Sequence, residues 1–392
     1  MKDKTICFIS PKFSGFIGGM ETHAIEFVNF FSKKGGYKIK AVFTRKVIDD
    51  GISAPNERVN PKLTSLVKPV LEGNFERDAK IILQHSDPLK DIYYLNSPTW
   101  LPALVILKKQ YPAMRIIVRS GGNDVMAGWV GSEADLNKNL EGSRMYIVNL
   151  INDYVEKLIV NSEYSLKRTA SVGVKSEKLL KIMGGVDCNK FKPSSDNRNP
   201  NKSTFELVTA ARLVKFKGFE YSLRAVKEVI DKSGLNVKYT IIGDGPERAN
   251  IEKIIKELGI SDKVQLIGSV SLEDVPGYLA EKDIFLHLPT YFQRNERGSS
   301  YIHTETMGRC LCEAAACGLP VVVSKVGGVS EIVIDKVTGF IVGEKDYIAA
   351  AEKIISLIKD SNLRAKMSKN ARRRAEDFFD FEKVFGAYER LF

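Results

Sequence analysis

The sequence contains no Asp-x-Asp motif, and its 392 residues include only five cysteines and four histidines. Carboxylates commonly hold a divalent cation against substrate phosphates, so the missing motif leaves no signal for a metal bridge. A small, odd number of cysteines in a long chain argues against a disulfide framework and favours a reducing compartment. Cys310, Cys312 and Cys317 lie close together, but their spacing does not match a zinc site. Buried packing is the simpler interpretation.

Long hydrophobic runs are also missing. No apolar run reaches the length of a membrane span, although 44% of the residues are hydrophobic. The first ten residues, MKDKTICFIS, contain an apolar stretch too short for a signal peptide, so they predict a first strand. The balance of 44% hydrophobic and 27% charged residues is typical of a soluble globular protein. Together with the cysteine content, these features predict a cytoplasmic protein.

The formal net charge of +11 predicts an anionic partner. Nucleic acid, a phosphate-bearing substrate and an anionic membrane surface are the three candidates. The sequence has no aromatic-interleaved basic patch and no zinc-finger or RNP motif, so we expect no nucleic-acid partner. A phosphate-bearing substrate and peripheral contact with the inner face of the plasma membrane both stay open.

Predicted strands and helices alternate in two series, which predicts α/β architecture with two doubly wound parallel sheets. The length supports two domains, because one core rarely extends to 392 residues. We predict domains at residues 1–195 and 196–376, joined near a linker-like segment, and a closing helix at 377–392 that packs on the first domain. The predicted strands are 5–10, 39–43, 91–96, 115–119, 157–160, 205–210, 237–242, 264–267, 283–288 and 320–324. The predicted helices include 20–34, 220–232, 247–258, 309–317, 346–359 and 361–376. Residues 45–90 are predicted to be irregular.

The segment ETMGRCLCEAAACGLPVVV, residues 305–323, combines two acids with a helix start. Glu313 lies on the predicted helix, and Glu305 lies in the loop before it, so both carboxylates could reach one cleft. The step from Gly308 to Arg309 places backbone N–H groups at a helix N-terminus, where anions bind. These features suit a ligand with phosphates and hydroxyls, such as a nucleotide sugar. Spacing alone also fits two ordinary surface glutamates.

Three further segments follow predicted strands. Gly18 and Gly19 precede the first helix, where glycine allows a backbone to approach phosphates. Arg212 and Lys217 follow the first strand of the second domain, and two cations there suit a diphosphate leaving group. Gly243 begins a Gly-Asp-Gly-Pro turn that could line the same site. Each segment alone also fits a plain turn or a solvated loop.

These segments together resemble the retaining family-4 glycosyltransferases of GT-B fold. The resemblance rests on GGME, ARLVKFKGFE, IGDGPE, the Glu305–Glu313 spacing, ACGLPVV and GGVSEIV, in that order along nearly the whole chain. It implies two Rossmann-like domains facing across a cleft, transfer of a hexose with retention of configuration, and no metal or other cofactor.

The resemblance also implies roles for individual residues. Arg212 and Lys217 would bind the donor diphosphate, Glu313 the ribose hydroxyls, and Glu305 a hydroxyl of the transferred sugar. Other implied donor contacts are Gly18, Gly19, Gly243, Thr306, Met307 and Gly308. We count Arg212, Lys217, Glu305 and Asp124 as the catalytic candidates.

The chain departs from the family pattern in two places. The family's His-Gly-x-Asp segment appears here as SGGND, so Gly121 stands where a histidine is usual, although Asp124 is kept. The role of that histidine cannot be transferred. The approach to Glu305 is a longer loop at residues 289–304, which contains His303. We expect this loop to border the sugar site and to influence the choice of donor or acceptor.

The sequence therefore predicts a glycosyltransferase that uses a nucleotide sugar, a UDP-sugar in preference to a GDP-sugar. The acceptor would be a carbohydrate, lipid-linked or small-molecule hydroxyl in bacterial surface polysaccharide, glycolipid or natural-product synthesis. A non-catalytic nucleotide-sugar-binding or scaffold protein and a GT-B-fold epimerase are the alternatives. A phosphorylase is disfavoured, because no pyridoxal-binding lysine context is found.

Activity is expected to persist in excess EDTA, because Arg212 and Lys217 rather than a metal would neutralise the leaving diphosphate. The measurement is the transfer rate with and without chelator. Complete loss in EDTA, with recovery on adding Mg²⁺ or Mn²⁺, would contradict this expectation.

Overall fold

The computed structural model describes residues 3–10, 19–45, 67–71, 74–128, 140–194, 202–296 and 299–392. The chain divides into two compact units. The first contains Met1–Met183, Arg294–Tyr301 and Ala387–Phe392, and the second contains Gly184–Gln293 and Ile302–Gly386. The main boundary between the units falls between residues 183 and 184, shortly after the last strand of the first sheet, which ends at residue 181.

The described part of the first unit is built on a parallel sheet of seven strands in the order β3-β2-β1-β4-β5-β6-β7. The strands are β1 Lys4–Ile9, β2 Tyr37–Arg45, β3 Val67–Leu71, β4 Asp91–Leu95, β5 Arg115–Arg119, β6 Lys157–Val160 and β7 Leu179–Lys181. The α-helices are α1 Gly19–Lys33, α3 Phe75–His85, α4 Leu101–Gln110, α5 Leu140–Tyr154 and α6 Glu163–Ser171. The order reverses between β1 and β4, as in a doubly wound sheet.

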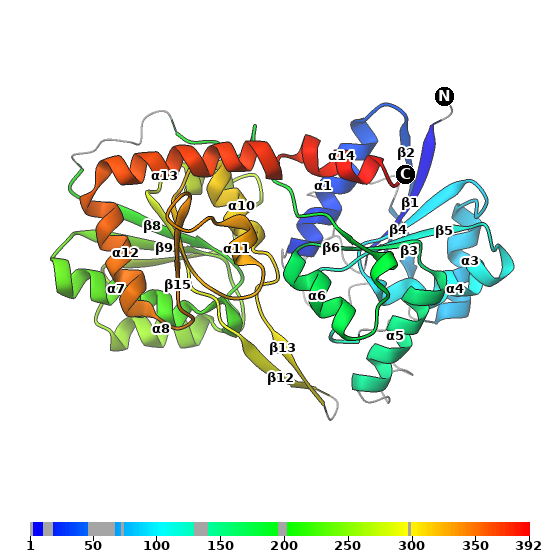
Figure 1. Ribbon diagram of the computed structural model, residues 1–392, viewed down its shortest axis with the longest axis horizontal. Coiled ribbons are helices and arrows are strands. Elements are labelled where there is room, and N and C mark those ends of the chain that lie inside the picture. The colour runs from blue at the N-terminus through cyan, green and yellow to red at the C-terminus, as the bar shows by residue number, and fades with distance from the viewer. Residues whose placement is uncertain are drawn as a thin grey trace. The chain divides into compact units, whose positions relative to one another are not determined.

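The second unit has a six-stranded parallel sheet in the order β10-β9-β8-β11-β14-β15. Its strands are β8 Phe205–Ala210, β9 Val237–Ile242, β10 Val264–Gly268, β11 Ile284–His287, β14 Val321–Ser324 and β15 Gly339–Val342. Its α-helices are α7 Phe219–Ser233, α8 Arg248–Glu257, α9 Val275–Ala280, α10 Arg309–Ala316, α11 Val329–Ile332, α12 Tyr347–Lys359 and α13 Ser361–Arg374. Figure 1 shows α7, α8, α10, α11, α12 and α13 around the sheet. The switch point here lies between β8 and β11, and it places the segments after these strands side by side.

Each unit has its own apolar core. Residues from β8, β9, β11, α7, α8 and α12 form one buried cluster in the second unit, and residues from β1, β4, β5, β6, α4 and α5 form another in the first. The central strands β4, β11 and β14 are buried along their whole length, as expected for parallel sheets covered by helices on both faces. This confirms the predicted α/β class with two doubly wound sheets.

Two predictions about local structure were wrong. Residues 45–90 are not irregular throughout, because β3 and α3 lie within them, while residues 46–66 fall outside the described part. Asn74 caps α3 by accepting a hydrogen bond from the Arg77 N–H, at 3.0 Å. The expected loop at 289–304 contains the two-stranded hairpin of β12 (Phe292–Glu296) and β13 (Ser299–His303).

The end of the chain contains a π-helical turn, Ala375–Phe379, followed by α14, Phe381–Glu389. In the first unit, the rings of Tyr388 and Phe392 lie 5.6 and 5.9 Å from that of Phe27 on α1. Phe27 in turn stacks on Tyr94 of β4, with the ring centroids 4.4 Å apart. These aromatic contacts attach the last six residues to the sheet of the first unit.

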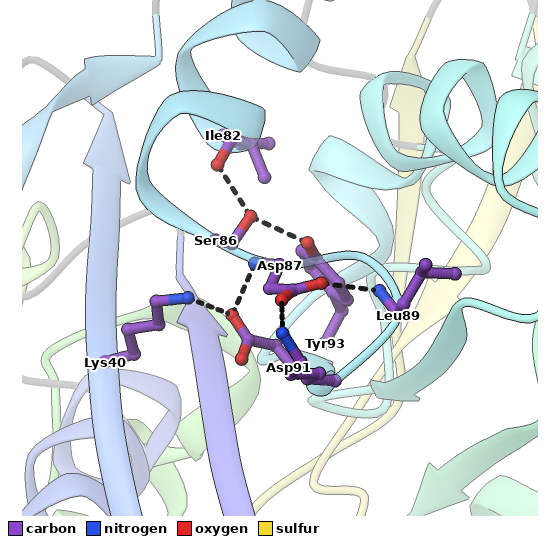
Figure 2. A network of polar contacts seen from close by, with 8 residues as sticks. Lys40, Ile82, Ser86, Asp87, Leu89, Asp91 and Tyr93 are labelled. Carbon is purple, nitrogen blue, oxygen red and sulfur yellow. Dashed lines mark hydrogen bonds and ion pairs between the residues drawn. The ribbon is translucent and has the colours of Figure 1, made fainter.

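A polar network fixes the turn between α3 and β4, at the amino end of β4 (Figure 2). Asp91 accepts hydrogen bonds from Lys40 Nζ at 3.0 Å and from the Asp87 N–H at 2.7 Å. Tyr93 donates to Ser86 Oγ, which donates to the Ile82 carbonyl, both at 2.6 Å. Asp91 is buried. Its carboxylate satisfies a backbone donor that would otherwise be left without a partner, so the network supports the fold.

Asp91→Ala is therefore expected to lower the free energy of unfolding by about 1–3 kcal/mol, because it leaves the Asp87 N–H unsatisfied. The measurement is the midpoint of urea unfolding. Lys90→Ala is the matched control, since it removes only the exposed ion pair with Asp87, and it should leave the midpoint unchanged. Equal effects of the two substitutions would contradict this account of the network.

Candidate functional site

The site in the second unit is centred on a buried ion pair between Lys217 and Glu305. Lys217 ends a 3-10 turn, Lys215–Lys217, shortly after β8, and Glu305 follows the hairpin and precedes α10. Lys217 Nζ donates to Glu305 Oε2, and both side chains are largely buried. The sequence placed these residues in one site, and the structure brings them into direct contact although they are 88 positions apart.

A third residue, His287, contacts the same carboxylate oxygen. It is the last residue of β11 and is fully buried, and its Nε2 lies 3.3 Å from Glu305 Oε2. Sequence reasoning missed His287. The signal that could have found it is a single polar residue within the apolar run IFLHL, at the carboxyl end of a central strand.

The three groups shift each other's pKa values. Burial by itself would raise the pKa of Glu305, but Lys217 and His287 outweigh it and hold that pKa far below its usual range. Burial favours the neutral form of Lys217, but Glu305 raises the pKa of Lys217 above its usual value. Burial, assisted by the charge of Lys217, lowers the pKa of His287 despite the opposing effect of Glu305. At neutral pH the cluster thus holds an ammonium, a carboxylate and an uncharged imidazole.

Arg212 adds a second positive charge. Its side chain is exposed, and it has no ion pair with any other residue in the described ranges. Its charge is close enough to Lys217 to lower the pKa of that ammonium. Arg212 and Lys217 both follow β8, and an anion bound between them would reduce the repulsion between their positive charges.

Glu313 lies one turn inside α10, as predicted, but its partner is local. Arg309 Nε donates to Glu313 Oε1 at 3.1 Å, and both side chains are mostly buried. The turn before α10 contains Thr306, Met307 and Gly308, all three of which are buried. The Gly184 N–H contacts Met307 Sδ at 3.1 Å, which holds this turn against the beginning of the second unit.

Close backbone packing fixes the position of Glu305. Gly327 has φ +52°, and a Cβ atom there would collide with the Glu305 carbonyl oxygen. The neighbouring Gly328 N–H donates to that same oxygen at 3.2 Å. Only glycine permits this approach, so the start of the GGVSEIV segment fixes the backbone that carries Glu305.

The remaining predicted residues are distributed over the two units. Gly243 follows the end of β9, and its N–H donates to the Gly268 carbonyl at 2.8 Å. Gly19 is the first residue of α1, and Gly18 lies outside the described residues.

Asp124 lies in a turn of the first unit and is buried. It accepts hydrogen bonds from Ser120 Oγ and from the N–H groups of Gly121 and Val125, the latter two at 3.1 and 3.0 Å. The structure thus shows Asp124 organising its turn, and a role in the reaction stays a prediction. A Cβ atom at Gly121 would lie 2.6 Å from Met20 Sδ, so a larger residue there would require this side chain to move.

Among the described residues, no group of three or more His, Cys, Asp or Glu side chains could hold a metal ion. None of the helices in that part of the chain is long and apolar enough to cross a membrane. The absence of a metal requirement remains a prediction.

The two parallel doubly wound sheets, with charged side chains after the central strands of the second, define a doubly wound α/β protein of two units. Solved structures share this architecture. Anabaena HepE in complex with UDP matches with a TM-score of 0.76 and 21% identity, covering 100% of this chain and 99% of that one. A glycosyltransferase from Rickettsia africae matches with a TM-score of 0.73 and 15% identity, covering 100% and 98%. These likenesses show the GT-B fold.

Residues 191–374 match the family model described as Glycosyl transferases group 1, and this part of the chain belongs to that family. A GDP-mannose-dependent alpha-(1-6)-phosphatidylinositol monomannoside mannosyltransferase of Mycolicibacterium smegmatis is 28% identical over 69% of this chain and 68% of its own length. An N-acetyl-alpha-D-glucosaminyl L-malate synthase of Bacillus anthracis is 28% identical over 47% and 44%, respectively. The match of residues 191–374 confirms, over that part of the chain, the resemblance to group 1 glycosyltransferases.

Gly327→Ala is expected to reduce activity on the order of a hundredfold, because displacement of the Glu305 backbone misplaces its carboxylate. Gly259→Ala is the matched control, since Gly259 has φ +66° but a Cβ atom there would meet nothing within 4 Å. The control should carry the same backbone strain, about 1–2 kcal/mol, and keep its activity. The measurement is kcat/KM of both variants, with thermal melting to compare stability. Equal losses of activity would show that strain alone is responsible.

Proposed function

We propose that the protein transfers a hexose from a nucleotide sugar to an acceptor hydroxyl, with the donor bound at the carboxyl ends of β8 and β11. The observation that carries the proposal is the buried Lys217–Glu305–His287 cluster. Glu305 Oε2 holds two partners, whereas Oε1 has no hydrogen bond or ion pair to any described residue. A buried carboxylate with one open acceptor oxygen suits a sugar hydroxyl, and Arg212 beside Lys217 suits a diphosphate.

The proposed mechanism assigns separate tasks to these residues. Lys217 has three N–H donors and uses one for Glu305, so the other two can face the leaving phosphate. Negative charge on that phosphate grows as the glycosidic bond breaks, and Lys217 and Arg212 stabilise it there. The leaving oxygen then accepts the proton of the acceptor hydroxyl on the same face of the sugar, which retains the configuration. We also propose Asp124, in the first unit, as a residue that contributes to the reaction.

The donor is proposed to be a UDP-sugar in preference to a GDP-sugar. HepE complexes with UDP and UDP-glucose support this choice, while the mannosyltransferase relative is named for GDP-mannose. The alpha linkages in the names of two relatives support retention. A lipid-linked, carbohydrate or small-molecule acceptor is proposed, with a cytoplasmic location and, through the net charge of +11, peripheral contact with anionic membranes.

The test is incubation of the purified protein with a panel of UDP- and GDP-sugars and pooled acceptors, followed by mass spectrometry. Release of nucleoside diphosphate with a glycosylated product supports the proposal, and Glu305→Gln is the inactive control. Donor binding without turnover would favour a scaffold protein. A changed sugar configuration in recovered donor would favour an epimerase.

The two glutamates are expected to differ in binding of free UDP, which carries the ribose but no sugar. Glu313→Gln should weaken UDP binding about tenfold, because a charged hydrogen bond to the ribose is lost. Glu305→Gln should leave UDP binding unchanged and mainly lower kcat, since its contact would tighten in the transition state. Calorimetric titration with UDP measures both variants.

Arg309→Gln is the control for the pair with Glu313, since it breaks the same ion pair and keeps the Glu313 carboxylate. Equal weakening by Arg309→Gln and Glu313→Gln would assign the effect to the ion pair. Weaker UDP binding in Glu305→Gln alone would show that the two roles are exchanged.

A further inference from the structure

His287 occupies an unusual position for a polar side chain. Its strand, β11, is central in the sheet of the second unit, and His287 pairs in register with Val323 of β14. The adjacent strand residues are buried and apolar. A polar ring in these surroundings costs free energy unless its hydrogen bonds are satisfied. Glu305 satisfies only Nε2, and Nδ1 has no partner among the described residues. If residue 287 only filled space in the core, leucine would fill it without an unsatisfied polar atom.

The chemistry of the contact fixes which nitrogen carries the proton. Glu305 is ionised and can only accept hydrogen bonds, so His287 must donate from Nε2. The pKa of His287 is lowered, mainly by burial, so the ring is uncharged and Nδ1 carries a lone pair. His287 therefore acts on Glu305 as a fixed neutral donor over the neutral pH range.

Two donors from different elements converge on one oxygen. Lys217 reaches Glu305 Oε2 from the turn after β8, and His287 reaches it from β11. Two fixed donors on Oε2 restrict rotation of the carboxylate and direct Oε1 away from them. A lysine alone would hold the charge but not the orientation, because its ammonium is a flexible point charge.

We propose that His287 is a positioning residue, which orients Glu305 so that Oε1 meets the hydroxyl of the transferred sugar. This inference rests on the proposed function, because it assumes that Glu305 contacts the donor sugar. His287 itself touches no substrate, and its effect passes through Glu305.

The titratable groups around Glu305 allow a specific pH test. Lys217 stays protonated in the acid range because its pKa is raised, mainly by Glu305 against the effect of burial. Burial raises the pKa of Cys310 on α10 to about 12, so its thiol stays neutral. Glu305 has a depressed pKa and loses its charge only when the pH falls far below neutrality. Removing the His287 donor raises that pKa, so protonation of Glu305 begins at higher pH.

The experiment compares His287→Leu with His287→Gln. Leucine keeps apolar bulk but removes the donor, and the glutamine side-chain amide restores an N–H near the position of Nε2. His287→Leu should lower kcat about tenfold to a hundredfold with unchanged UDP binding, and the acid limb of its pH–rate profile should shift to higher pH. His287→Gln should recover most of the rate and return the acid limb toward that of the wild type.

Several results would overturn the inference. These are wild-type kcat in His287→Leu, an equal loss in both variants, or an unmoved acid limb. Should His287→Leu fail to fold, ¹⁵N NMR of the wild-type ring provides the test, with protonation at Nε2 expected and protonation at Nδ1 contradicting the proposal. A wild-type protein that is inactive with all donors would instead refute the proposed function, and the NMR result would still test the His287 contact.

Discussion

The buried ion pair between Lys217 and Glu305 is the interaction on which the candidate site depends. Moving the Lys217 ammonium and the Glu305 carboxylate out of water costs several kcal/mol per ion, and only close, well-directed contacts offset this cost. The structure supplies those contacts through His287 and through the close backbone packing of Gly327 on Glu305. An apolar pair of similar volume would serve stability equally well or better. The buried ions therefore fit the proposed role in donor binding better than a role in stability.

The network that supports the fold and the candidate site belong to different sheets, and they lie at opposite ends of their strands. The Asp91 network lies at the amino end of β4 and satisfies backbone donors in a turn. Lys217, His287 and Arg212 all lie at or after the carboxyl ends of β8 and β11, where the strand order reverses. Ligands of doubly wound sheets bind at that edge, because the loops there diverge and leave room. In the second unit, the strand order and the charged side chains therefore both point to the carboxyl ends of β8 and β11 as the candidate site.

Sequence patterns predicted the buried parallel strands well, because a strand covered on both faces is a continuous apolar run. They missed the four-residue apolar strand Gly339–Val342, and their other failures came where pairing rather than composition makes the strand. Val67–Leu71 includes a proline and lies at an edge of the sheet, and Leu179–Lys181 has three residues at the other edge. The hairpin Phe292–His303 is polar and lacked an Asn-Gly or Asp-Gly turn signal. None of these latter segments carries the hydrophobic pattern on which the predictions relied.

The sequence predicted several residues of the site but not which of them contact one another. Lys217 and Glu305 each had a local signal, yet their contact depends on the packing of segments 88 positions apart. His287 was missed because a single histidine in an apolar run is indistinguishable, by sequence alone, from a packed core residue. Its significance comes from the neighbouring carboxylate, and that neighbour is set by the tertiary fold.

A crystal structure with a bound, non-hydrolysable UDP-sugar tests the central claim most directly. The account predicts a hydroxyl of the sugar within hydrogen-bonding distance of Glu305 Oε1, with His287 and Lys217 still on Oε2. It also predicts the diphosphate beside Arg212 and Lys217. A ligand bound elsewhere, or a sugar that contacts neither oxygen of Glu305, would contradict the account.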